Sequence, residues 1–119
     1  MRTWGGRFTG ETDPRAAAFT RSVDLDRALV RDDIAGSIAH VRGLGRAGLL
    51  ISSEVQTITD GLLALAEDAA ADRLAWDPAL EDVHMNVEAA LGERIGPLAG
   101  RLHTGRSRND QIATDLRLW

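Results

Sequence analysis

The spacing of apolar residues is the feature that most constrains the fold of this 119-residue chain. Between positions 25 and 44 most apolar steps are three or four residues, the period of an α-helix, with one step of five: Leu25, Leu29, Ile34, Ile38, Val41 and Leu44. No segment sustains the two-residue alternation of a half-buried strand, and β-branched residues are sparse. The pattern therefore predicts an all-α fold.

The first 24 residues are predicted to form an arm with one short helix. Residues 1–12 are Gly-rich and polar and have no period, which indicates an extended segment. Asp13 followed by Pro14 offers an N-cap and a proline at the first helical position. A short helix is expected from there through Phe19.

Local signals predict where the next helices end and begin. Gly48 is suited to the position just past the end of the first long helix. Ser53 and Gln56 have the spacing of a capping box, and they precede a second stripe: Val55, Ile58, Leu62, Leu65, Ala66 and Ala69. The loop 73–78 follows and carries Trp76, which we interpret, together with Trp4, as a packing anchor for an irregular segment.

The last third of the chain is predicted to hold two helices separated by a loop. The first spans 81–95, with Val83, Val87, Leu91 and Ile95 on one face, and ends at Gly96-Pro97. The segment 98–106 is expected to be a loop. Ser107 and Asp110 are then spaced as a cap and its acidic partner, and the apolar face of the helix over 107–119 carries Ile112, Leu116 and Trp119.

No glycine or proline closes the last helix before Trp119. We therefore expect the sequence as given to end inside a longer helix. Because the partners of its apolar face would lie elsewhere, that face is predicted to be exposed to solvent or to another chain.

Composition excludes several functional classes. Apolar residues make up 44% of the chain and charged residues 27%, which is ordinary for one globular domain. A net charge of −4 disfavours a nucleic-acid binder. There is no cysteine, and His40, His84 and His103 are scattered without metal-ligand spacing. Neither a signal peptide nor a long apolar run appears, so no membrane contact and a cytoplasmic location are expected.

The stretch from His103 to Gln111 carries the most chemistry. Its letters are HTGRSRNDQ, which place hydroxyls, guanidinium groups and carboxamides around a junction between loop and helix. Backbone N–H groups at a helix start and nearby arginines favour an anion, and arginine binds a carboxylate at two points. A capped helix with a charged first turn is the equally weighted alternative from physical chemistry alone.

As a string, this stretch closely resembles the signature of argininosuccinate lyases, of the fumarase and aspartase superfamily. Other segments agree with that family in order and spacing over the whole chain: residues 4–8, 19–22 with Asp26, 33–34 with 39–40, 81–84 with Glu88 and Leu91, and 114–119. The resemblance covers only the front portion of the family's polypeptide.

The resemblance implies a function and an assembly. The family cleaves argininosuccinate reversibly into arginine and fumarate in arginine biosynthesis, without a cofactor or a metal. Its members are homotetramers around a central helical bundle, and each active site is drawn from three subunits. The implied organisation is an arm and mobile substrate loop over 1–24, a helical domain over 25–106, and the start of a central-bundle helix over 107–119.

The resemblance also assigns roles to individual residues. Ser22 matches a substrate-binding serine on the mobile loop, and Arg108 and Asn109 match positions that hold the substrate carboxylate and the arginine moiety. His84 matches a supporting histidine, with Asp82 beside it. The remaining substrate-binding positions shape the same loop: Thr104, Arg106 and Ser107. No catalytic residue is expected in this chain, because the family's Thr-His segment and its loop with the catalytic serine and a lysine lie further along, and this sequence has no lysine.

Each of these residues has a structural alternative. Ser22 is of a type common in turns and caps, Asp82 is suited to a helix start, and His84 could be a surface residue that pairs with Glu88 one turn later. Other polar residues are interpreted as structural or solvated: His40, Asp32, Asp33, Glu67 and Asp68.

Three competing functions stay open at this point. One is another fumarate-releasing lyase of the superfamily, against which the segment from Arg106 to Asp110 argues. Another is a non-enzymatic structural relative, as the lens δ-crystallins are, which the sequence downstream of Trp119 would distinguish. The third is an independent small helical interaction domain, which the uncapped last helix disfavours.

Overall fold

The computed structural model describes residues 9–119, so the expectations for residues 1–8, including Trp4, lie outside the described residues. Over the described range the chain forms helices and no strand, which confirms the predicted all-α class. The elements are α1 (Pro14–Thr20), α2 (Val23–Asp26), the 3-10 turn η1 (Arg27–Leu29), α3 (Val30–Arg46), α4 (Ser52–Ala70), η2 (Pro78–Leu80), α5 (Val83–Ile95), η3 (Gly96–His103) and α6 (Arg108–Leu118).

The short helix α1 begins as predicted. The Asp13 side chain accepts a hydrogen bond from the backbone N–H of Arg15 at 2.8 Å, and Pro14 occupies the first helical position. The step of five in the next stripe marks a real break, because η1 separates α2 from α3. Leu25 lies before that break and is 83% exposed, so its predicted place in the buried stripe was wrong.

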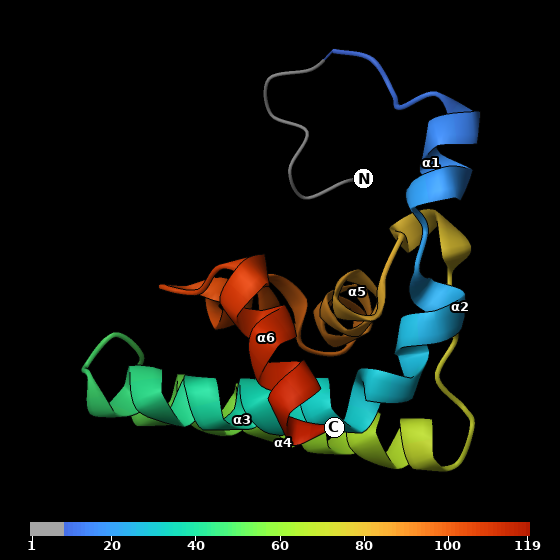
Figure 1. The fold of residues 1–119 in the computed structure, drawn as a ribbon. Coiled ribbons are helices and arrows are strands. Elements are labelled where there is room, and N and C mark those ends of the chain that lie inside the picture. The colour runs from blue at the N-terminus through green and yellow to red at the C-terminus, as the bar shows by residue number, and fades with distance from the viewer. Residues whose placement is uncertain (1–8) are drawn as a thin grey trace.

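A tight turn joins α3 to α4, which lie side by side along the base of the molecule (Figure 1). Gly48 has a φ of 76°, and its N–H donates to the Gly45 carbonyl while Leu49 N–H donates to the Leu44 carbonyl. This pair of bonds is the glycine-based helix ending that the sequence predicts.

The start of α4 differs from the prediction. The backbone N–H of Ile51 donates to Glu54 Oε1 at 3.1 Å, whereas Gln56 Nε2 donates to Asp60 instead. The capping box over Ser53 and Gln56 was therefore wrong, because the N-cap is Ile51, two residues before Ser53, and Glu54 accepts the free N–H group there.

Two boundaries near α5 also need correction. The helix begins at Val83 and not at Glu81, whose φ of 69° is incompatible with a helix. The segment expected to be a loop over 98–106 is helical as far as His103, as the 3-10 helix η3. Leu102 is 1% exposed there, so contact with the core holds the segment in a regular conformation.

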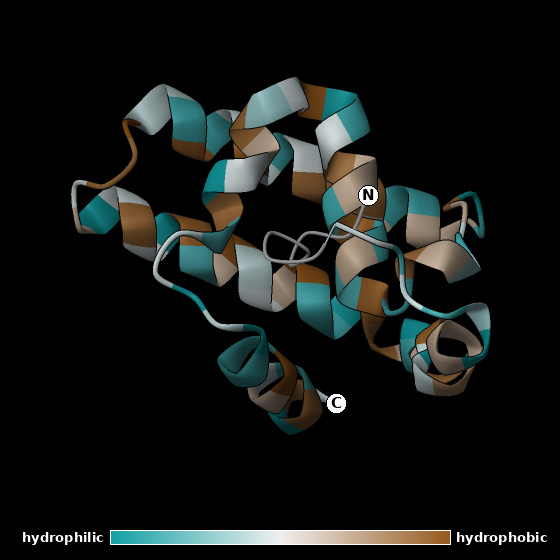
Figure 2. Cartoon of the chain, turned by 90° about the horizontal axis from the view of Figure 1, so that it is seen from above, coloured by the Kyte–Doolittle hydropathy of each residue, from teal (hydrophilic) through white to brown (hydrophobic). Residues whose placement is uncertain are grey.

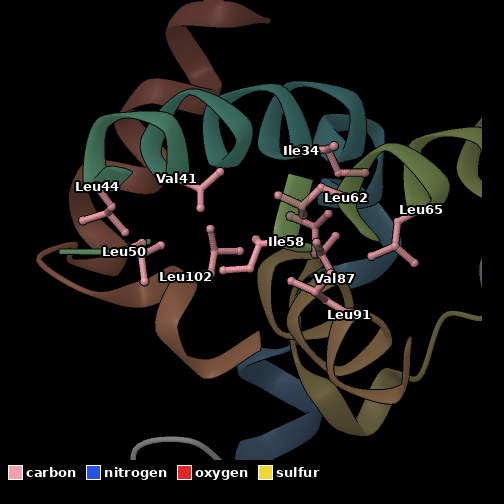
Figure 3. Packing of buried hydrophobic residues seen from close by; sticks show 11 residues of the cluster. Ile34, Val41, Leu44, Leu50, Ile58, Leu62, Leu65, Val87, Leu91 and Leu102 are labelled. Carbon is pink, nitrogen blue, oxygen red and sulfur yellow. The ribbon is translucent and has the colours of Figure 1, made fainter. Parts of the chain in front are cut away.

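The core lies between α3, α4, α5 and η3 (Figure 3). Its buried members are Ile34, Val41, Leu44, Leu50, Ile58, Leu62, Leu65, Val83, Val87, Leu91 and Leu102. Gly61 lets α4 and α5 approach closely, since a Cβ there would lie 2.8 Å from Leu91 Cδ1. Trp76 packs against this cluster, which confirms its interpretation as a packing anchor.

Helix α6 lies across α3 (Figure 1). Several of its residues beside the C label are apolar, drawn brown in Figure 2, and its large apolar side chains are exposed. Ile112 is 36% exposed, Leu116 57% and Trp119 79%, as predicted. None of the described helices is long and apolar enough to cross a membrane.

Candidate active site

The start of α6 has the predicted capping box. The backbone N–H of Ser107 donates to Asp110 Oδ2 at 2.8 Å, and Ser107 Oγ accepts from the N–H of Asn109 at 3.2 Å. Gly105 has a φ of 64°, which permits the turn into the helix. These contacts fix the backbone of Arg108 and Asn109 in the first turn.

Arg108 is held at the wall of a cleft. Its guanidinium lies 3.0 Å from Glu88 Oε1 through one terminal nitrogen, and the other donates to Gln111 Oε1 at 2.6 Å. The cleft has a volume of about 920 Å³, and its polar lining residues are Glu81, Asp82, Glu88, His103 and Arg108. Arg108 and Asp82 are thus the two predicted site residues that share this cleft.

The neighbouring predicted residues have different surroundings. Asn109 is exposed, and among the described residues its side chain has no hydrogen-bond partner. Thr104 Oγ1 donates to the Arg101 carbonyl at 2.7 Å, while the Thr104 carbonyl lies 2.8 Å from His40 Nε2. His40 therefore anchors the loop before α6, which confirms its structural interpretation.

Arg106 is directed toward α3 and does not line the cleft. One terminal nitrogen donates to Ser37 Oγ at 3.0 Å. The other two guanidinium nitrogens are buried and make no hydrogen bond to the described residues. This burial lowers the pKa of Arg106.

Ser22 lies beside the start of α5. Its hydroxyl donates to Asp26 Oδ2 at 2.7 Å, and Asp26 Oδ1 accepts from the N–H of Val83 at 3.1 Å. The backbone N–H of Ser22 also donates to the Glu81 carbonyl at 2.9 Å. Ser22 occupies the N-cap position of α2, yet its side chain makes no capping bond.

Asp82 has the structural role considered for it. Its side chain caps α5 by accepting from the N–H of Met85 at 2.8 Å. The same residue lines the cleft beside Glu88. Asp82 can cap the helix and line the cleft at the same time, because the capping bond uses only one of its carboxylate oxygens, Oδ1.

His84 does not lie on the surface. Its exposure is 2%, and its Nδ1 lies 2.8 Å from Asp33 Oδ1 and 3.4 Å from Asp115 Oδ2. The alternative in which it pairs with Glu88 at the surface was therefore wrong. Asp33, interpreted as structural or solvated, is 1% exposed and so is not solvated.

A buried polar network links this cluster to the cleft. Gln111 Nε2 donates to Asp33 Oδ1 at 2.7 Å, and Gln111 Oε1 accepts from Arg108. The sequence predicts no site role for Asp33, Gln111 or Asp115. A signal existed, because Gln111 and Asp115 are one turn apart on the face of α6 toward α3.

Comparison with known proteins places this chain in a family. Residues 6–119 match the model of a family described as lyase. The chain belongs to the lyase family. The matched residues cover nearly the whole chain, so the described helices and the cleft all fall within the matched region.

Curated relatives of this lyase chain are named argininosuccinate lyase. That of Nitrosococcus oceani is 53% identical over 99% of the chain, that of Methylococcus capsulatus 53% over the whole chain, and that of Deinococcus deserti 54% over 99%. The chain spans about a quarter of the length of these relatives.

Asp33, His84 and Asp115, the titratable groups of the buried cluster, have unequal affinities for protons. Burial raises the pKa of the Asp115 carboxyl to about 7, with the neighbouring Asp33 adding to the effect. Burial opposes ionisation of Asp33 as well, but the hydrogen bond and charge of His84 outweigh it and lower the pKa of Asp33. The same contact raises the pKa of His84 against the effect of its burial.

These groups also have the atom types of a metal site. One ligand atom from each of Asp33, His84 and Asp115 lies within 4.8 Å of the others. Gln111 Nε2 nevertheless directs a hydrogen toward Asp33 Oδ1, and a cation bound there would face that donor. The geometry therefore favours a cluster held by protons and hydrogen bonds.

Proposed function

We propose that this chain forms the carboxylate-binding part of an argininosuccinate lyase, which cleaves argininosuccinate to arginine and fumarate. The observation that carries the proposal is the position of Arg108, a guanidinium fixed in the cleft wall at the start of α6. The names of the similar proteins support the same reaction.

The proposed chemistry is an elimination in which a base removes a proton next to a carboxylate and the C–N bond then breaks. The intermediate carries extra negative charge on that carboxylate. Arg108, the exposed Asn109 amide and the N-terminal dipole of α6 are donors of the kind that stabilise such charge when they are held in place beforehand. We place the base outside this chain, in the serine loop that the family resemblance implies.

The remaining assignments extend this proposal. Ser22 would contribute from the arm, since it lies beside the start of α5, where Asp82 lines the cleft. The exposed apolar residues of α6 suit a helix that enters a bundle, which supports a homotetramer. A cytoplasmic location and the division into arm, helical domain and bundle helix remain predictions.

The test uses the complete polypeptide that carries this chain. Purified protein is supplied separately with argininosuccinate, adenylosuccinate, malate and aspartate, and fumarate is followed by its ultraviolet absorbance. Of these four compounds, we expect the protein to cleave only argininosuccinate. Preference for another substrate would indicate a different branch of the superfamily, and no turnover of any would indicate a crystallin-like role. The 119-residue chain alone should release no fumarate.

A further inference from the structure

Gln111 forms hydrogen bonds both to Asp33 in the protein interior and to Arg108 in the wall of the cleft. The residue is 4% exposed, although it has a polar side chain. Its amide nitrogen donates to Asp33 Oδ1 at 2.7 Å, and its amide oxygen accepts from Arg108 at 2.6 Å. Both ends of the amide are thus used, one by a buried carboxylate and the other by a guanidinium of the cleft wall.

We propose that Gln111 is a positioning residue for Arg108, and that the buried Asp33 carboxylate sets the orientation of the Gln111 amide. This inference rests on the proposed function, because it requires Arg108 to bind a substrate carboxylate. Gln111 itself would not touch the substrate.

The orientation of the amide follows from the hydrogen-bonding capacity of its partners. An ionised carboxylate only accepts hydrogen bonds and a guanidinium only donates them. A reversed amide would therefore set its oxygen against Asp33 and its NH₂ against Arg108. The observed arrangement is the one in which neither end is repelled.

Contacts with both Glu88 and Gln111 restrict the Arg108 side chain more than either contact alone would. The contact with Glu88 at 3.0 Å joins side chains that are each about a quarter exposed, and a partly exposed ion pair restrains a long side chain only weakly. Gln111 adds a second contact whose own position is fixed by burial. A site held by such a supporting shell binds its ligand in a defined geometry.

The neutrality of Gln111 matters because charged groups surround it. The titratable and charged side chains near these contacts are Asp33 of α3, His84 and Glu88 of α5, His103 of η3, Arg106 in the loop before α6, and Arg108 and Asp115 of α6. A carboxylate at position 111 would face Asp33 without a donor between them. Such a side chain must bind a proton to restore the observed bonds.

The first experiment removes both contacts in the complete polypeptide. Gln111→Met keeps length and flexibility but has no amide. We expect KM for argininosuccinate to rise about tenfold or more, as for loss of a bond to a charged group, and kcat to fall as well, because Arg108 also stabilises the charge of the intermediate. Gln56→Met is the matched control, because Gln56 likewise donates to a carboxylate, that of Asp60 on the same helix, but is exposed on α4. Its KM should equal that of the unsubstituted enzyme.

The second experiment gives a readout that a purely structural role would not produce. Protonated Gln111→Glu has one O–H for Asp33 and one carbonyl for Arg108, so it reproduces both contacts. We expect its KM to return toward the unsubstituted value as the pH falls from about 8 to about 5.5, whereas KM of Gln111→Met relative to the unsubstituted enzyme stays high throughout. Circular dichroism at each pH establishes that the variants are folded.

The outcomes separate the two proposals. Unsubstituted enzyme that fails to cleave argininosuccinate overturns the proposed function. Active unsubstituted enzyme with an unchanged KM in Gln111→Met overturns the positioning role. If Gln111→Met does not fold, the Gln111→Glu variant decides: recovery at acidic pH supports the role, and a pH profile parallel to that of the unsubstituted enzyme overturns it.

Discussion

His84 Nδ1 and Asp33 Oδ1 lie 2.8 Å apart in the interior, although 51 positions separate the two residues in the chain. The contact ties α5 to α3, and Asp115 brings α6 to the same point. Three helices of the lyase chain therefore meet at a polar cluster and not only at apolar side chains. Both stability and its dependence on pH should reflect this arrangement.

Asp33→Ala should destabilise the complete polypeptide strongly. Removing one partner of a buried pair leaves the other charge without compensation, which costs roughly 3 kcal/mol of unfolding free energy. The loss should be larger at pH 6, where His84 is protonated, than at pH 8. Chemical denaturation measures it. The neighbouring Asp32 makes no ion pair to the described residues, and Asp32→Ala should stay within about 0.5 kcal/mol. Equal effects of the two substitutions would contradict the buried pair.

The Asp115 carboxyl should make the fold less stable as the pH rises. Its pKa is about 7 in the folded chain against an ordinary value of 3.8, so the folded state holds the proton more tightly. Its stabilising contribution is complete below about pH 3.8 and is lost as the pH rises through about 7. The pKa of His84 is raised above its ordinary value of 6.5, so its stabilising contribution is likewise lost as the pH rises above 6.5.

Asp115→Asn tests this dependence. The amide stays neutral at every pH and offers an N–H donor to the neighbouring Asp33 carboxylate, as the protonated Asp115 carboxyl does. We expect the Tm of the variant to exceed that of the unsubstituted protein at pH 8 and the advantage to shrink toward pH 5. The exposed Asp24 supplies a control, since the Tm difference between Asp24→Asn and the unsubstituted protein should be about the same at pH 8 and pH 5. A constant difference for Asp115→Asn would rule out the shift.

Two serines near helix starts should respond differently to alanine. Ser107 Oγ accepts a backbone N–H of α6, so Ser107→Ala should cost about 1 kcal/mol of unfolding free energy. The Ser53 side chain makes no hydrogen bond to the described residues, and Ser53→Ala should be neutral or slightly stabilising. Paired urea titrations measure both. If Ser53→Ala lowered the unfolding free energy more than Ser107→Ala, the result would support the capping box over Ser53 and Gln56 and contradict the cap described at Ile51.

These contrasts show which parts of the structure the sequence could predict. Local rules located the α6 cap at Ser107 and the glycine that ends α3 at Gly48, because each depends on a few adjacent residues. The prediction of a cap at Ser53 failed because the helix has its N-cap two residues earlier, at Ile51, whose N–H group donates to Glu54. Spacing could not reveal the burial of His84, which depends on Asp33 from a distant helix.

The candidate site was predicted only in part for the same reason. The string from Thr104 to Asn109 identified the right segment, yet Thr104 and Arg106 contact the protein itself. Gln111 lies two residues beyond that string and resembles a solvated helix residue in sequence. Its role appears only when α3 is packed against α6.

The most direct measurement is the kinetics of Asn109→Asp in the complete polypeptide. Asn109 is exposed beside Arg108 and its side chain has no partner among the described residues, so the change should leave Tm unaltered and suits the helix dipole. If Asn109 faces a substrate carboxylate, the substitution removes a hydrogen bond to that carboxylate worth roughly 1.5–3 kcal/mol and adds repulsion between two negative charges. The predicted fall in kcat/KM is about a hundredfold or more.

Asn86→Asp is the matched control for that measurement. The Asn86 amide donates to the carbonyls of Asp77 and Asp82, so a carboxylate there should lower Tm through repulsion in the fold. Asn109→Asp should show the reverse pattern, an unchanged Tm with the hundredfold or greater loss of kcat/KM. Unchanged kcat/KM in a folded Asn109→Asp enzyme would contradict the placement of the substrate carboxylate at the start of α6.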